Sequence, residues 1–237
     1  MFVNNNSITP VVRIGIVRRF IQILVLFGIL SAVLLFSSGQ TDWLWAWVFI
    51  GIYIGSTVFN SIALLKRRPE IIAERSMTQI EHGWEKLIGG LWALLYFLAV
   101  PLMAGLDMRY EWSADISLTV HIIGVICFSV GTALFSWALL ENAFFTTASR
   151  IQKERGQTVC MSGPYQYIRH PGYLGAIIQS FAAPMLLGSF WALIPGFLSA
   201  LLMIVRTKME DKMLRQELIG YEAYAERTKY RVFPGIW

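Results

Sequence analysis

Charged residues are scarce in this sequence of 237 residues. Asp, Glu, Lys and Arg together make up 15% of it, against 56% hydrophobic residues, and the mean hydropathy is +0.55. An average soluble domain has about 25% charged residues. The shortage of charge therefore excludes an ordinary soluble protein and indicates a chain that lies largely within a membrane.

Several motifs that carry common chemistries are also missing. There is no Gly-x-Gly sequence, which excludes the Rossmann dinucleotide fingerprint, and there is no P-loop or Gly-x-Ser-x-Gly element. His82, His121 and His170 lie in separate segments without metal-ligand spacing, so no metal site is expected. Cys127 lies in an apolar run and Cys160 in a loop, and we expect no disulfide between them.

What the chain has instead are long runs without a charged residue. They cover residues 20–41, 43–65, 87–106, 116–140 and 172–205. A bilayer core of about 30 Å takes roughly 20 helical residues, so each of the first four runs supplies one membrane helix. The fifth run, of 34 residues, is too long for one crossing and is interrupted by Pro184, Gly188 and Pro195. We therefore predict an all-α integral membrane bundle of about six transmembrane helices, the last two forming a short hairpin.

The basic residues indicate how such a bundle is oriented. Lys and Arg gather on the cytoplasmic side of membrane proteins. With six crossings, 19 of the 20 Lys and Arg residues fall on one side and only Arg109 on the other. Five crossings would move the basic segment 206–231 across the membrane. We therefore expect a multi-pass protein with both termini in the cytoplasm, whose net charge of +5 faces membrane lipids and not nucleic acid.

The chain is predicted to form a single membrane domain over residues 1–237. Residues 1–140 supply helices one to four and carry few ionisable groups, whereas residues 141–237 carry most of the chemistry. No internal repeat or low-complexity tract divides it further. The functional site is therefore expected in the C-terminal part.

Three local patterns add further expectations. Loop 66–86 has alternating charges and is predicted to lie on the membrane surface as a solvated face. Gly51 and Gly55, four residues apart, predict a close helix contact. Apolar residues recur at helical spacing from Met209 to Tyr221, which predicts that the last membrane helix runs on into an amphipathic cytoplasmic helix.

The most informative stretch runs from Gly163 to Gly175, at the start of the fifth apolar run. It combines an arginine, a histidine, three tyrosines and two prolines, a mixture that gathers at a membrane boundary when it shapes a site. The charged segment 206–231 follows the apolar run and can fold back beside it. Together they predict one cytoplasmic pocket, whose candidate residues are Asn142, Gln152, Tyr165, Arg169, His170, Tyr173, Arg206, Glu210 and Asp211.

Such a pocket suits a ligand that has charges of both signs and an aromatic ring. Carboxylates hold an ammonium group or a ribose diol, and an arginine binds a carboxylate in bidentate fashion. Tyrosine and histidine rings stack on a base and favour a nearby cation. S-adenosyl-L-methionine carries all of these groups, so it is the cofactor that the residues indicate.

Arg206 and Glu210 lie four residues apart, on one face of the predicted helix. One interpretation is an intrahelical salt bridge, which contributes a few tenths of a kcal/mol. The other is that Arg206 binds the ligand or acceptor and Glu210 the cofactor. The sequence leaves both interpretations open.

Two motifs in this part of the chain are specific in combination. They are Gly163-Pro-Tyr165-x3-Arg169-His170-Pro171-x-Tyr173-x-Gly175 and Arg206-x3-Glu210-Asp211-x2-Leu214. Through them residues 141–237 resemble the isoprenylcysteine carboxyl methyltransferase family, in its bacterial and archaeal members. The resemblance implies a site for S-adenosyl-L-methionine at the cytoplasmic face and a lipid-tailed or prenylated acceptor that enters from the bilayer.

The resemblance also implies roles for individual residues. Arg206, Glu210 and His170 are the implied catalytic residues, with Arg206 handling the acceptor carboxylate. The implied cofactor contacts are Gln152, Gln157, Thr158, Val159, Cys160, Tyr165, Arg169, His170, Pro171, Gly172, Tyr173, Glu210 and Asp211. Gln157 stands where eukaryotic members have a histidine, Gly172 where they have a serine, and Asp211 where a second glutamate is common.

Related activities differ in the chemical group that accepts the methyl group. A carboxylate is ionised at pH 7 and needs no general base, whereas an amine must lose a proton, with His170 or Glu210 as possible base. The absence of an obvious tuned base favours the carboxylate of a prenylcysteine-like acceptor. The alternatives are a phospholipid N-methyltransferase, an NADPH-dependent sterol-type reductase of the same fold, and a membrane scaffold or transporter component without catalysis.

Overall fold

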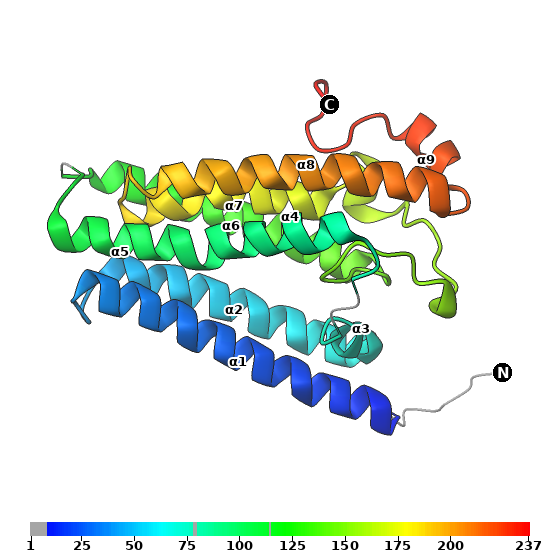
Figure 1. Cartoon of the computed structure of the whole chain (residues 1–237), viewed down its shortest axis with the longest axis horizontal. Coiled ribbons are helices and arrows are strands. Elements are labelled where there is room, and N and C mark those ends of the chain that lie inside the picture. The colour runs from blue at the N-terminus through cyan, green and yellow to red at the C-terminus, as the bar shows by residue number, and fades with distance from the viewer. Residues whose placement is uncertain (1–8, 78–79, 114) are drawn as a thin grey trace.

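The computed structural model describes residues 9–77, 80–113 and 115–237, and the regular elements within them are all helical (Figure 1). In chain order they are α1 (Pro10–Ser38), α2 (Leu44–Arg67), α3 (Pro69–Glu74), α4 (Gly83–Leu94), the π-helix η1 (Leu95–Ala99), α5 (Val100–Tyr110), α6 (Leu118–Glu141), the 3-10 helices η2 (Lys153–Arg155) and η3 (Gly163–Gln166), α7 (Pro171–Leu187), α8 (Leu193–Glu217) and α9 (Tyr221–Arg227). The predicted all-α class is confirmed.

Four helical stretches are long and apolar enough to cross a membrane. They are α1, α2, the continuous stretch Gly83–Tyr110 formed by α4, η1 and α5, and α6. The apolar helix α7 is shorter, with 17 residues. These helices coincide with the uncharged runs of the sequence, and they indicate a multi-pass integral membrane protein.

The fifth apolar run forms the hairpin that its breaks predict. α7 ends at Leu187, and Gly188 follows in the left-handed region with φ of +74°, where glycine is favoured. The Ser189 amide donates to the Pro184 carbonyl at 2.9 Å and completes the helix cap. α8 then continues without interruption from Leu193 through its apolar half into its charged half, as expected.

Helices α6 and α7 approach each other at two glycines. A Cβ on Gly131 would lie 2.8 Å from the Gly175 carbonyl oxygen, and one on Gly175 would lie 2.6 Å from the Gly131 carbonyl oxygen. Neither position has room for a side chain, so the two backbones pack directly against each other. This contact fixes the two helices that flank the loop 142–170, where most of the predicted site residues lie.

Helix α1 contacts different partners at its two ends. At its start, Gly15 packs on α3, where an added Cβ would lie 2.6 Å from that of Ala73. Toward its end, Ser37 packs against Gly105 of α5. α1 and α3 thereby form one wall of the bundle, opposite α7 and α8 in Figure 1.

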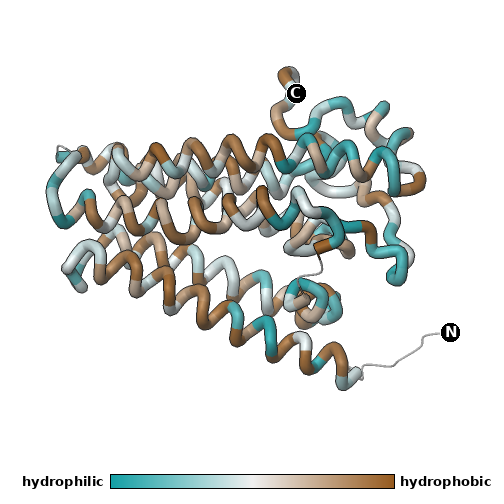
Figure 2. The backbone as a smooth tube through the Cα atoms, in the orientation of Figure 1, coloured by the Kyte–Doolittle hydropathy of each residue, from teal (hydrophilic) through white to brown (hydrophobic). Residues whose placement is uncertain are grey.

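Hydrophilic residues concentrate at the end of the bundle that carries α3, the charged half of α8, and α9 (Figure 2). We call this the charged end. The C-terminal tail folds back there, since the Arg169 amide donates to the Tyr230 carbonyl at 3.0 Å and the His170 amide to the Arg231 carbonyl at 2.9 Å. The two halves of the predicted pocket are therefore adjacent in space.

One expectation about helix contacts was wrong. A Cβ added to Gly51 or Gly55 would meet nothing within 4 Å among the described residues, and both positions are exposed. α2 buries its other face, through Ala46, Phe49 and Ile50. The small residues of α2 therefore point away from the bundle and do not mediate a helix contact within it.

Candidate active site

The charged half of α8 presents three of the predicted residues at the charged end. Arg206 and Asp211 are buried, and Glu210 is partly exposed. Opposite them, Pro171 begins α7 and His170 occupies its N-cap position. A proline suits the first turn of a helix because its missing N–H has no partner there. The Arg-His-Pro sequence thereby places Arg169 and His170 just before the helix, beside α8.

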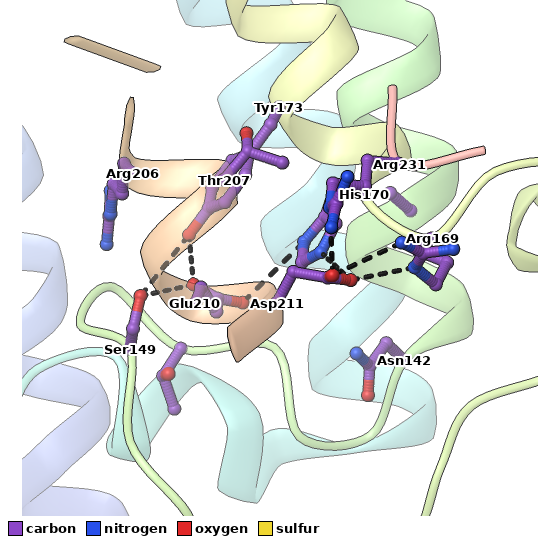
Figure 3. A network of polar contacts seen from close by, with 12 residues as sticks. Asn142, Ser149, Arg169, His170, Tyr173, Arg206, Thr207, Glu210, Asp211 and Arg231 are labelled. Atoms are coloured by element: carbon purple, nitrogen blue, oxygen red, sulfur yellow. Dashed lines mark hydrogen bonds and ion pairs between the residues drawn. The ribbon is translucent and has the colours of Figure 1, made fainter. Parts of the chain in front are cut away.

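Asp211 is the centre of a buried polar network (Figure 3). Arg169 donates to its two oxygens, at 2.7 Å and 3.2 Å, and Arg231 donates at 2.9 Å. The Tyr221 hydroxyl donates at 3.0 Å, and Nε2 of His170 lies 3.4 Å away. Both oxygens of this carboxylate are therefore occupied by protein groups.

Electrostatics keep Asp211 ionised despite its burial. Burial favours the neutral acid, but the hydrogen bonds and charges of His170 and Arg169 outweigh it and hold the pKa of Asp211 well below its usual range. Arg169 also donates to the carbonyls of Thr228 and Lys229, at 2.7 Å and 2.9 Å. The Arg169–Asp211 pair thus fastens α7, α8 and the tail to one another.

Glu210 faces a different group of side chains, one helical position earlier. Its Oε2 accepts hydrogen bonds from the hydroxyls of Tyr173 and Ser149. Its Oε1 accepts none from the described residues and lies 3.9 Å from Nδ1 of His170. The rings of His170 and Tyr173 are parallel, with centroids 5.5 Å apart. This arrangement leaves one carboxylate oxygen free beside a pair of stacked rings.

Arg206 does not form the salt bridge with Glu210 that its spacing allowed. It forms a bidentate pair with Glu85 of α4, with Nε at 3.2 Å from Oε2 and Nη2 on Oε1. It also donates to the Thr147 carbonyl at 3.0 Å and lies over the Tyr173 ring at 5.3 Å. α4 packs against α8 at this level, so a partner from another helix replaces the intrahelical one.

Glu85 and Glu74 also correct the description of loop 66–86 as a solvated face. Glu85 is 3% exposed, and Glu74 is 8% exposed and pairs with Arg150. Both acids neutralise an arginine from the C-terminal part of the chain. Sequence reasoning missed Glu74, Glu85 and Arg150 because their partners lie on segments distant in sequence. The only signal was the position of Glu85 directly before an apolar run.

A cavity of about 430 Å³ connects these groups with the interior of the bundle. Ten of the thirteen predicted cofactor contacts line it: Gln157, Thr158, Val159, Cys160, Tyr165, Arg169, His170, Gly172, Tyr173 and Glu210. Gln152, Pro171 and Asp211 are not among its lining residues. Of the predicted catalytic residues, Arg206, Glu210 and His170 all line it. The structure therefore brings most of the predicted site together around one cavity.

Gln152 lies behind the cavity wall. It is fully buried, and its side-chain amide donates to the Phe144 carbonyl at 2.8 Å and accepts from Arg155. Its backbone N–H donates to Oε1 of Gln157 at 2.7 Å. Gln152 thus positions the segment 157–160, which does face the cavity.

Two groups of the wall are neutral. Burial raises the pKa of Tyr165 and that of Cys160 above their ordinary values. Asn142 donates to the Tyr165 hydroxyl at 3.4 Å, and the Tyr165 carbonyl accepts from Tyr224 at 2.7 Å. Tyr165 is therefore a fixed, uncharged ring, and Cys160 presents a thiol and not a thiolate nucleophile.

The fold and the site define a class of protein: a helical, multi-pass membrane protein with a cavity that is lined by polar groups of its charged end and by apolar side chains of its helices. Residues 123–216 match the isoprenylcysteine carboxyl methyltransferase (ICMT) family. This part of the chain, from α6 into the last turn of α8, is an ICMT family domain, and the family is that of the isoprenylcysteine carboxyl O-methyltransferases. Helices α1 to α5 lie outside the match.

Proposed function

We propose that this chain transfers a methyl group from S-adenosyl-L-methionine to the carboxylate of a prenylcysteine-like acceptor, at the cytoplasmic face of a membrane. The observation that carries the proposal is the continuity of the cavity. One part of it is lined by polar residues such as Gln157, Thr158, His170 and Glu210, and the other by apolar side chains such as Phe27 and Phe97. A charged cofactor and a lipid tail need environments of these two kinds.

The residues present fit S-adenosyl-L-methionine. The free Oε1 of Glu210 is an acceptor for an ammonium or a ribose hydroxyl, and the buried Thr147 hydroxyl, which lines the cavity, has no partner among the described residues. His170, Tyr173 and Tyr165 offer ring faces. When bound, the cofactor supplies an activated methyl group on a sulfonium cation.

The chain's own contribution is mainly to align the reactants and to exclude water, which together supply several kcal/mol. An acceptor carboxylate is already ionised at neutral pH, so no general base is required. We assign Arg206 to orient this carboxylate and Glu210 and His170 to hold the cofactor. Glu85, Thr147 and Tyr173 fix the guanidinium plane of Arg206 through Nε, Nη2 and the ring contact. Its Nη1 donates to none of the described residues and is the N–H that would reach the acceptor carboxylate.

The same proposal includes the topology. The apolar helix α7 and the apolar half of α8 serve as a fifth and a sixth crossing, so that both termini face the cytoplasm. The distribution of 19 of 20 basic residues supports this arrangement. A tag on Trp237 should be accessible only after the cell membrane is permeabilised.

Cofactor titration tests the proposed enzyme class. The purified full chain should bind S-adenosyl-L-methionine in calorimetry and should show no saturable binding of NADPH. A reductase would give the opposite pattern, and a scaffold would bind neither. Glu210→Gln serves as the matched variant because it keeps the size of the side chain and removes its charge.

A further inference from the structure

A second pair of cations lines the cavity from the wall formed by α1 and α3. The pair consists of Arg19 in α1 and Arg75, which directly follows α3. Arg19 donates to the Arg75 carbonyl at 3.3 Å and to Oε1 of Gln22 at 3.4 Å. Gln22 in turn donates to the Ser76 carbonyl at 3.1 Å. These contacts hold the two guanidinium-bearing segments side by side.

Neither cation has an acidic partner within the described residues. Arg150, Arg169 and Arg206 each pair with a carboxylate, but no ion pair involves Arg19 or Arg75. Nη1 of Arg75 is fully buried and donates no hydrogen bond to any described residue. The Arg75 guanidinium lies over the Phe145 ring at 5.4 Å, but no acidic side chain of the described residues neutralises the positive charge of this wall.

Uncompensated charge is unfavourable in a partly buried position, which both arginines occupy. Burial, followed by the charge of nearby Arg19, lowers the pKa of Arg75 to about 9, so its cation is destabilised yet still predominates at pH 7. A buried charge is normally retained when it is paired. An anion from outside the chain would restore the missing partner.

The surroundings of the pair indicate what kind of anion fits. Ile23, Leu26 and Phe27 of α1 line the same cavity, together with Phe97 of η1. Apolar helix faces next to two cations suit an amphiphile, with a negative head group and a long hydrocarbon chain. A small, soluble anion would leave these apolar surfaces unused.

We propose that Arg19 and Arg75 form a capture site for the anionic head group of the lipid-tailed acceptor, a carboxylate. The choice of a carboxylate rests on the proposed function. In this arrangement the α1–α3 wall governs binding of the acceptor from the bilayer, and Arg206, on α8, governs its alignment for transfer. Arg19 and Arg75 lie outside the family match, so the assignment concerns the part of the chain that is not shared with the family profile.

Binding of two matched probes tests the capture site without turnover. The probes are N-acetyl-S-farnesylcysteine and its neutral carboxamide, titrated into the full chain in lipid nanodiscs in the absence of any methyl donor. Arg75→Gln should weaken binding of the acid about tenfold, the scale of one charge-assisted contact, and leave the amide unchanged. Arg19→Gln should act in the same direction, and Arg75→Lys should retain most of the affinity.

Arg18→Gln is the matched control, because Arg18 is the neighbouring residue on α1 but is exposed and does not line the cavity. It should leave both affinities unchanged. Equal weakening of the acid and the amide in both Arg75→Gln and Arg19→Gln would show a loss of cavity shape and overturn the proposal. An equal loss in Arg18→Gln would reduce the effect to surface electrostatics and overturn it as well.

Kinetics separate this site from the transfer step. With the acid as acceptor, Arg75→Gln should raise KM about tenfold and change kcat less than twofold, whereas a lower kcat at unchanged KM would contradict a capture role. Failure of the proposed function gives a distinct result. In that case no variant transfers a methyl group to the acid, yet the charge-dependent binding of the acid in the absence of donor remains measurable.

Discussion

The two walls of the cavity differ in whether their arginines have acidic partners among the described residues. On the α7–α8 wall, Arg206 is paired with Glu85, and Arg169 is paired with Asp211, which lies behind the wall and also accepts from Arg231 and Tyr221. On the α1–α3 wall, Arg75 has a buried N–H without a partner. A saturated network fixes one geometry, whereas an unsatisfied one favours a ligand. The comparison assigns the alignment of the bound reactants to the first wall and the capture of the anionic acceptor to the second.

Removing the centre of the saturated network should have the largest effect. Asp211→Ala leaves the buried Arg169 without its carboxylate, and breaking such a pair costs about 3–5 kcal/mol of folding free energy. We expect loss of most folded protein in a thermal-stability assay. Arg215→Ala removes a partly exposed partner of the same carboxylate and should cost less than about 1 kcal/mol. Equal effects of the two variants would contradict a central role for Asp211.

Lowering the pH should destabilise the folded protein through the same network, by protonating Asp211. The pKa of Asp211 is lowered in the folded state, against about 3.9 when unfolded, so its stabilising contribution is complete above pH 4 and is lost as the pH falls below that value. Asp211→Asn removes this titration. The pH dependence of unfolding below pH 4 should therefore be shallower in the variant, and an identical slope would show that other carboxylates cause it.

Arg206→Lys should affect transfer more than binding. Lysine keeps the charge but cannot hold Glu85 in bidentate fashion and present a further N–H to the acceptor in the same plane. About 2–4 kcal/mol of transition-state stabilisation should therefore be lost, roughly thirty- to several-hundredfold in rate. Binding of S-adenosyl-L-methionine should be retained. Near-normal methyl transfer in Arg206→Lys would mean that Arg206 only pairs with Glu85. The rate of Glu85→Gln, which removes the charge of that partner, is measured for comparison.

Glu210→Gln and His170→Ala should each weaken S-adenosyl-L-methionine binding about tenfold, as expected for one lost charge-assisted contact. Calorimetry on folded protein measures this effect. Lys208→Ala, an exposed change on α8, is the control and should be neutral. Unchanged affinity in both site variants would remove these two residues from the cofactor site.

The smallest effect on folding stability is expected for an alanine substitution at Gly51, and the same substitution at Gly131 is the contrasting case. Gly51 lies in open space on a helix, so Gly51→Ala should be neutral or stabilise the protein by up to about 1 kcal/mol. Gly131→Ala places a Cβ against the α7 backbone and should destabilise the protein. Thermal unfolding of both variants measures the difference. Destabilisation by Gly51→Ala would show that α2 makes a contact absent from the described structure.

The helices and much of the site could be predicted because their signals are local. The uncharged runs gave the apolar helices, the breaks near Gly188 gave the hairpin, and the Arg-His-Pro sequence gave the residues around the cavity. The pairing of Arg206 with Glu85 could not be predicted, since it depends on which face of α8 packs against α4. The same holds for Arg75, whose importance follows from the absence of a partner in three dimensions.

The chemical lability of a transferred label tests the central claim most directly. The full chain in nanodiscs is incubated with methyl-labelled S-adenosyl-L-methionine and, separately, with N-acetyl-S-farnesylcysteine, its carboxamide and phosphatidylethanolamine. The account predicts label only on the acid, in a form that base releases as methanol, as a methyl ester requires. Base-stable label on the amine of phosphatidylethanolamine, or no label on the acid, would contradict it.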